Sequence, residues 1–130
     1  MRSAHSGLLL FAHGARDPNW SLPFEAVLER VRERAPDRLV DLSYLEFMAP
    51  TLLDAGAALA AAGCTRVDIV PLFLGTGGHV RKDVPLLIEA LRIAHPHVVW
   101  ALQSAIGEAP GVIDAMATAA LQNTASAHTP

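Results

Sequence analysis

Four short apolar runs, separated by segments with helical periodicity, constrain the fold of this chain more than any other feature. The second run is mixed, although Val40, Leu42 and Tyr44 favour a strand there. Near-continuous apolar strands are typical of a parallel sheet that is covered by helices on both faces. We therefore predict strands over Gly7–Ala12, Leu39–Phe47, Val67–Leu74 and Val98–Leu102.

The segments between and after these runs carry helical patterns. In the first of them, Phe24, Val27, Leu28 and Val31 fall on one helix face. In the third, Asp83 is a plausible cap that would place a proline in the first helical turn. The predicted helices span Pro23–Arg34, Thr51–Ala62, Val84–Ala94 and Pro110–Leu121.

Strands and helices thus alternate along the whole chain, which favours an α/β fold of three layers. Right-handed crossovers and flavodoxin-like topology predict a four-stranded parallel sheet of order 2-1-3-4. The length of 130 residues suits one domain. We expect residues 1–122 to form this domain and the small, polar residues 123–130 to form a flexible tail.

Composition excludes several classes of function. The formal net charge of −3 gives no basic excess for binding nucleic acid. No apolar stretch reaches the roughly 18 residues needed to cross a bilayer, so no membrane partner is expected. The apolar run after Arg2 is short and lacks a clear cleavage site, which disfavours a signal peptide. Because Cys64 is the single cysteine, a reducing, cytoplasmic location is the default expectation.

Three chemically active residues follow predicted strands. Ligands of open α/β sheets bind beyond the carboxyl ends of the strands where the strand order reverses, which here lies between the first and third strands. His13 ends the first strand, Glu46 lies near the end of the second, and His79 follows the third in the segment GTGGHVRKD. The predicted topology therefore brings the three to one edge of the sheet.

Two imidazoles and a carboxylate suit a divalent metal such as Co²⁺, Fe²⁺, Ni²⁺ or Zn²⁺. One histidine could bind the metal while the other accepts a proton near neutral pH. Each residue also has a simpler interpretation. His13 could occupy a tight turn with Gly14, His79 an irregular glycine-rich loop, and Glu46 a polar strand end.

The neighbouring residues leave similar alternatives open. Arg16, Arg81 and Lys82 could be solvated, or they could bind carboxylates of a substrate held above the sheet edge. The glycine segment could bind phosphate through its backbone N–H groups, yet it lacks both the G-x-G-x-x-G pattern and the P-loop lysine. His95 and His97 precede the fourth strand, so they are expected at the opposite edge.

Three motifs together resemble a known family. They are AHGARDP near the start, LEFMAP in the middle and PLFLGTGGHVRKDVP in the third quarter. In order and spacing, from about Leu8 to Ala115, they resemble the small CbiX/SirB sirohydrochlorin chelatases, which are class II chelatases. The resemblance implies a lyase that inserts Co²⁺, or alternatively Fe²⁺, into sirohydrochlorin during cobalamin or sirohaem biosynthesis.

The resemblance also implies roles for particular residues. His13 and His79 match the family's metal-binding and proton-accepting histidines, and Glu46 is similar to a carboxylate beside the metal in related chelatases. Arg16, Arg81 and Lys82 become candidate contacts to the carboxylates of the tetrapyrrole. The metal would be a substrate, with no cofactor permanently bound, and a single short copy resembles the form that makes a homodimer.

Two rival functions remain open at this point. A non-catalytic carrier of metal or tetrapyrrole would use the same pocket, and only turnover separates it from a chelatase. A histidine-dependent phosphoryl enzyme is suggested by the His-Gly-x-Arg order at His13. Enzymes of that kind usually have an arginine directly before the His-Gly pair, where this chain has Ala12.

Overall fold

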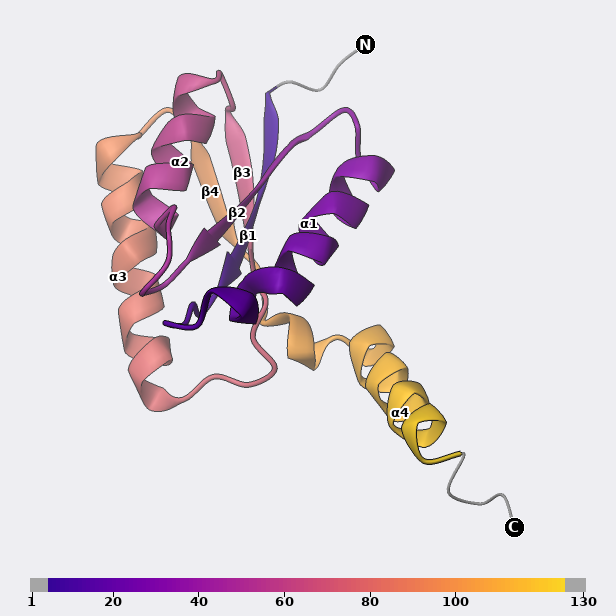
Figure 1. Ribbon diagram of the computed structural model, residues 1–130. Helices are drawn as coiled ribbons and strands as arrows, with labels where there is room; N and C mark the ends of the chain where they lie inside the picture. Colours follow the sequence, from indigo (N-terminus) through magenta and orange to yellow (C-terminus); the bar gives the residue numbers. More distant parts are fainter. Residues whose placement is uncertain (1–4, 126–130) are drawn as a thin grey trace.

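The computed structural model of this protein describes residues 5–125, apart from the side chains of His79 and Ala125. Strands and helices alternate along the chain (Figure 1). The strands are β1 (Ser6–Ala12), β2 (Leu39–Tyr44), β3 (Arg66–Pro71) and β4 (Val99–Leu102). The helices are η1 (Pro18–Ser21), α1 (Leu22–Arg34), α2 (Leu52–Ala61), α3 (Gly78–Ala94), η2 (Ile106–Glu108) and α4 (Pro110–Ala125).

The sheet confirms the predicted architecture. Its four strands are all parallel and lie in the order β2-β1-β3-β4. The register pairs Leu10 of β1 with Leu42 of β2 and Val70 of β3. Since β1 lies between β2 and β3, the strand order reverses beside it, and the carboxyl end of β1 is the switch point of the fold.

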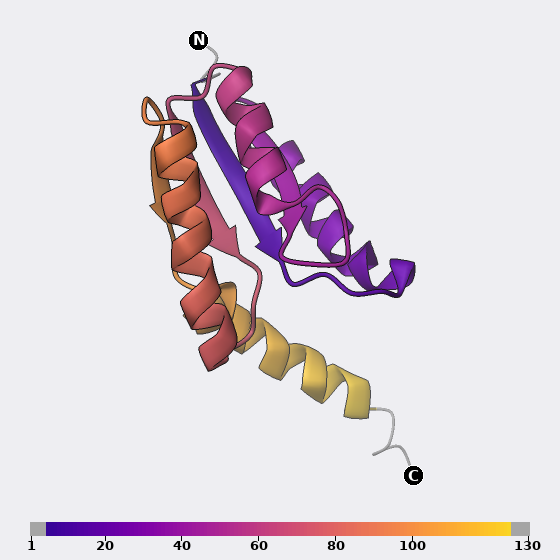
Figure 2. The same ribbon diagram turned by 90° about the vertical axis from the view of Figure 1, so that its left-hand side faces the viewer.

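Helices α2 and α3 cover one face of the sheet, and α1 lies on the other (Figure 2). Under α2 and α3, the core includes Phe11, Ile69 and Trp100, each at most 3% exposed. Under α1, Leu10 and Leu42 pack against Phe24, Leu28 and Val31 of that helix. Alternate residues of each strand serve the two cores, as the two-residue side-chain period of a strand requires.

Helix α4 occurs where the helical pattern predicts it, yet it does not pack on the sheet. It projects away from the body of the molecule beyond the carboxyl edge of the strands (Figures 1 and 2). Apart from the half-buried Val112, every residue from Gly111 to Thr124 is exposed. The helix continues to Ala125, three residues into the segment expected to be a tail, and residues 126–130 lie outside the described part.

Helix α4 ends four residues after its predicted end, and the predicted bounds of three further elements were wrong by three residues or more. Strand β2 ends at Tyr44 and β3 at Pro71, each three residues before the predicted end. Helix α3 begins at Gly78, six residues before the predicted start. Its buried stripe extends back to Val80, which packs with Val84, Ile88 and Leu91, and this packing outweighs the low helix propensity of glycine.

Within residues 5–125, the helices are all too short or too polar to cross a membrane.

Candidate functional site

His13 occupies the switch point of the sheet. It directly follows β1, which ends at Ala12, and its side chain is half-buried. The imidazole packs against the ring of Phe73, with 4.8 Å between the ring centroids. Phe73 follows β3 and is 3% exposed, so it forms a firm support on the side of that strand. The imidazole is thus positioned between the ends of β1 and β3 while part of it remains accessible.

The loop after β2 joins the same edge. The backbone N–H of Leu45 donates to the carbonyl of Ala12 at 2.9 Å, and that of Glu46 donates to the carbonyl of His13 at 3.0 Å. These bonds continue the pairing of β1 and β2 beyond the ends of both strands. The prediction that Glu46 lies beside His13 is therefore confirmed for the backbone, and the Glu46 side chain is exposed to solvent.

Gly14 makes this close approach feasible. Its φ of +91° lies in the left-handed region, which disfavours residues with a Cβ. A Cβ added there would lie 1.8 Å from the carbonyl oxygen of Glu46. Both observations explain why glycine follows His13. Because residue 14 has no Cβ, the loop after β2 can pack against the backbone beside the histidine.

His79 belongs to a helix rather than a loop, which corrects the expectation from sequence. It is the second residue of α3, just after Gly78 and the N-cap Gly77. The chain reaches this point directly from the end of β3, so the amino end of α3 lies at the carboxyl edge of the sheet. The backbone of His79 therefore arrives at the edge that carries His13.

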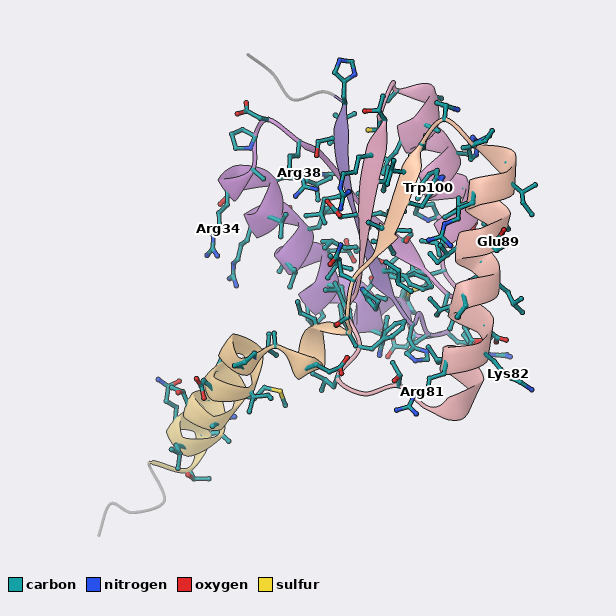
Figure 3. All side chains as sticks on the ribbon, turned by 180° about the vertical axis from the view of Figure 1, so that it is seen from behind. Arg34, Arg38, Arg81, Lys82, Glu89 and Trp100 are labelled. Atoms are coloured by element: carbon teal, nitrogen blue, oxygen red, sulfur yellow. The ribbon has the colours of Figure 1, made fainter. Side chains whose placement is uncertain are left out.

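The three cationic candidates differ in their surroundings. The guanidinium carbon of Arg16 lies 4.7 Å from the centroid of the Phe47 ring, a cation–π contact. The Nε of Arg81 donates to Oγ1 of Thr76 at 3.3 Å. Figure 3 shows Arg81 directed beneath the sheet, whereas Lys82 points outward from α3. Arg16 and Arg81 therefore suit contact with a ligand at this edge better than Lys82 does.

No group of three or more His, Cys, Asp or Glu residues that could hold a metal occurs among the described side chains. Because the side chain of His79 is outside that set, this result does not test the predicted trio of His13, His79 and Glu46. The trio stays a prediction. What the geometry supplies is one accessible imidazole and one exposed carboxylate on hydrogen-bonded neighbours.

His95 lies away from His13, as expected, and so does the buried Cys64. His95 follows the carboxyl end of α3, at the opposite edge of the sheet, and packs against Trp100 with 5.9 Å between ring centroids. Cys64 is fully buried. Its burial, together with the charge of Asp41, raises the pKa of the thiol, which disfavours a reactive thiolate.

Two aromatic residues of the site were not anticipated. Phe73 supports the His13 ring, and Phe47 lies beneath Arg16 with a left-handed φ of 65° and 57% exposure. Their positions in the sequence could have indicated this role. Each is an aromatic residue just beyond the end of a strand that borders the switch point. An exposed phenylalanine there offers a flat apolar surface beside the histidine.

The strand order places this chain in the class of open α/β proteins, which bind ligands where the order of the strands reverses. A family model described as CbiX matches residues 7–123, so this chain belongs to the CbiX family. The match begins in β1 and ends in α4, and it includes every residue discussed at the site.

Similar proteins with curated names are sirohydrochlorin cobaltochelatases. The protein from Saccharolobus islandicus is 35% identical over 85 residues, which are 63% of this chain and 62% of that protein. The protein from Methanosarcina acetivorans is 32% identical over 79 residues, 61% of each chain. The matched segments thus cover less than two thirds of these relatives' own length.

Solved structures show the same fold. A putative cobalamin biosynthesis CbiX protein from Marinobacter aquaeolei VT8 has a TM-score of 0.85 and 30% identity, covering 95% of this chain and 98% of that one. The sirohydrochlorin chelatase SirB from Bacillus subtilis subspecies spizizenii, in complex with cobalt, has a TM-score of 0.76 and 27% identity. SirB from Bacillus subtilis with Fe³⁺ has a TM-score of 0.80 and 25% identity. This chain covers 49% of either SirB chain.

Proposed function

We propose that this protein is a sirohydrochlorin chelatase that inserts Co²⁺, or alternatively Fe²⁺, into sirohydrochlorin. The observation that carries the proposal is the partly accessible imidazole of His13 at the switch point of a CbiX-family fold. The curated relatives are named for this reaction with cobalt. The two SirB structures, which contain cobalt and Fe³⁺, support a metal as substrate.

The reaction exchanges two protons for one metal ion. A free-base tetrapyrrole loses two pyrrole N–H protons as the divalent ion enters, so the charge balances. The ion must also release its protein ligands as it gains ring nitrogens, which favours few ligands over a closed cage. In this proposal His13, His79 and Glu46 hold the ion on one face of the ring, and one histidine takes a pyrrole proton.

The cationic side chains at the edge suit the periphery of the substrate. Sirohydrochlorin carries eight carboxylates, and a guanidinium binds a carboxylate through two parallel hydrogen bonds. Arg16 and Arg81 are the better candidates because of their placement, and Lys82 is a third. The exposed ring of Phe47 adds a flat apolar contact for a macrocycle.

The proposal also covers the oligomeric state, the cellular location and the biosynthetic pathway of the protein. We include a homodimer, supported by the unpacked helix α4, and a cytoplasmic location, supported by the lone buried cysteine. Cobalt would place the protein in cobalamin biosynthesis and iron in sirohaem biosynthesis. Ni²⁺ is a further candidate, since the same ligand types accept all three ions.

The test is anaerobic incubation of the purified protein with sirohydrochlorin and Co²⁺, Fe²⁺ or Ni²⁺ separately, with insertion followed by absorbance. His13→Ala and His79→Ala should each lower the insertion rate by about 100-fold or more, as expected for loss of a ligand or proton acceptor. His97→Ala is the matched control, because His97 is an exposed histidine at the opposite edge. Its rate should equal that of the original protein.

Two results would count against the proposal. Insertion at the uncatalysed rate by the original protein, with tetrapyrrole still bound, would indicate a non-catalytic carrier. Normal turnover in both His13→Ala and His79→Ala would show that metal insertion does not depend on the histidines at this edge of the sheet.

A further inference from the structure

Phe47 combines a strained backbone with an exposed aromatic ring. Its φ of 65° lies in the left-handed region, which bulky residues rarely adopt. The N–H of Met48 donates to the carbonyl of Glu46 at 2.8 Å, so the chain closes a three-residue γ-turn around Phe47. With a positive φ at its centre, this is the rare and strained form of that turn. The side chain is 57% exposed, so burial of the ring does not compensate for the strain.

The residues on either side of Phe47 hold this turn in place. The N–H of Glu46 donates to the carbonyl of His13 at 3.0 Å. Leu45 packs against the core under α2 and α3, and Met48 packs against the core under α1. Because these apolar neighbours face inward, the turn leaves Phe47 directed outward at the edge that carries His13. Strain that the surrounding structure maintains is characteristic of functional sites, so the exposed ring calls for a functional explanation.

The ring of Phe47 contacts the side chain of Arg16. The guanidinium carbon lies 4.7 Å from the ring centroid. Arg32, Arg38 and Arg66 each form an ion pair with an aspartate. Within the described residues 5–125, by contrast, neither a hydrogen bond nor an ion pair engages the guanidinium of Arg16. The ring therefore restrains this guanidinium while its N–H groups stay available to a ligand.

We propose that Phe47 is a positioning residue for Arg16, and that the pair forms a preorganised binding point for one carboxylate at the rim of the tetrapyrrole. A mobile arginine side chain loses conformational freedom when it binds a ligand. The ring beneath the guanidinium removes part of that loss in advance, without accepting the N–H groups that a carboxylate requires. This inference rests on the proposed function, and it assigns Phe47 to substrate affinity rather than to the metal-insertion step.

The first test compares affinity with turnover in Phe47→Asn. Asparagine tolerates the left-handed region and removes the ring. In a fluorescence titration with metal-free sirohydrochlorin, the Kd should rise by about 10-fold, the effect expected when one arginine loses its restraint. The KM for sirohydrochlorin in Co²⁺ insertion should rise by a similar factor. The kcat should stay within about 2-fold of the original, because the metal ligands and the proton acceptor are unchanged.

Three further variants control for the chemistry of the ring. Phe47→Tyr keeps an aromatic face and should retain the original Kd. Phe47→Leu keeps apolar volume without an aromatic face, so its Kd should rise as in Phe47→Asn. Ile93→Asn removes an apolar side chain that is 74% exposed near the carboxyl end of α3, and its Kd should equal the original. An original Kd in Phe47→Leu would show that the aromatic ring is not required, which would overturn the inference.

A double-mutant cycle shows whether Phe47 acts through Arg16. Arg16→Gln should raise the Kd for sirohydrochlorin by about 10-fold, because a charged hydrogen bond to a carboxylate is lost. In the Arg16→Gln background, Phe47→Asn should raise the Kd further by at most about 2-fold, since no guanidinium is left to position. Equal fold-changes for Phe47→Asn in the two backgrounds would overturn the positioning role and leave the ring as an apolar contact alone.

Unfolding in urea without a ligand tests the strain directly. The midpoint for Phe47→Asn should equal or exceed that of the original, whereas a clearly lower midpoint would show a structural role and overturn the inference. If the original protein inserts metal and Phe47→Asn binds sirohydrochlorin with the original Kd, the positioning role is wrong and the chelatase is correct. Binding without insertion would contradict the chelatase alone, because the Kd comparison needs no turnover. If the original protein does not bind sirohydrochlorin, both are wrong.

Discussion

Three neighbouring residues fix the position of the His13 side chain. Gly14 allows the β2 loop to approach, the Glu46 amide fixes that loop to the His13 carbonyl, and Phe73 supports the imidazole ring. A histidine on a less constrained turn could adopt several orientations. Here the ordered backbone on both sides limits these orientations, and the proposed role of His13 as a metal ligand requires such a restriction.

At this scale we predict that Gly14→Ala is more damaging than its size suggests. The added Cβ would clash with the Glu46 carbonyl oxygen, and the positive φ would be strained as well. We expect a loss of about 2 kcal/mol in the free energy of unfolding, measured in urea, and a slower metal insertion. Gly75→Ala is the matched control for stability, because an added Cβ there meets nothing within 4 Å. Equal stability of the two variants would contradict the role given to Gly14.

The sequence was sufficient to predict that His13 and Glu46 come together, because parallel strands end at a common edge. It was insufficient to identify Phe73 as the support of the imidazole. That contact depends on how the chain turns after β3, which ends three residues earlier than its apolar pattern indicates. Apolar residues that leave a sheet to line a site have the same pattern as residues inside a strand.

Among the elements, α3 shows why a helix start can be misread. Asp83 and Pro85 look like the beginning of a helix, and Gly77 and Gly78 look like a loop. The actual start is fixed by tertiary packing of Val80 in the core, a contact that local propensity does not contain. The correction matters for function, since it moves His79 from a loop to the first turn of a helix.

Helix α2 has the more conventional start and allows a direct test. The Oγ1 of Thr51 accepts a hydrogen bond from the N–H of Asp54 at 3.1 Å and so satisfies one donor of the first turn. Thr51→Ala should reduce the free energy of unfolding by about 1 kcal/mol in a urea titration. Thr51→Ser keeps the hydroxyl and should retain most of the stability. An alanine variant as stable as the serine variant would show that the cap contributes nothing.

For the molecule as a whole, strand order was predictable and the placement of α4 was not. The order 2-1-3-4 was predicted from right-handed crossovers together with flavodoxin-like topology, and both apply within one chain. Whether a terminal helix covers its own sheet depends on its junction and on the surfaces available to it. The sequence of α4 predicts a helix, but it does not specify which surface that helix will cover.

A cluster of charged side chains links two strands on the α1 side of the sheet. Because it contains a carboxylate, the free energy of unfolding should depend on pH. Asp68 of β3 accepts hydrogen bonds from Arg38 and Arg66, each at 2.9 Å. Arg38 also donates to the carbonyl of Gly7 in β1 at 3.1 Å, so the cluster spans the connection before β2 and the two central strands. Burial alone would raise the pKa of Asp68, but the two guanidinium groups outweigh it and hold the pKa below its ordinary value.

Because the pKa of Asp68 is lower in the folded state, its carboxylate stabilises the fold above the ordinary pKa of an aspartate, about 4. This contribution is lost as the pH falls through the folded-state pKa. Asp68→Asn should therefore lower the free energy of unfolding by about 1 kcal/mol at pH 7, a modest value because the cluster is partly solvated. The difference from the original protein, measured in urea, should shrink progressively below pH 4. Glu33→Gln, at an exposed position of α1, should show neither effect, and a pH-independent deficit in Asp68→Asn would assign its cost to packing instead.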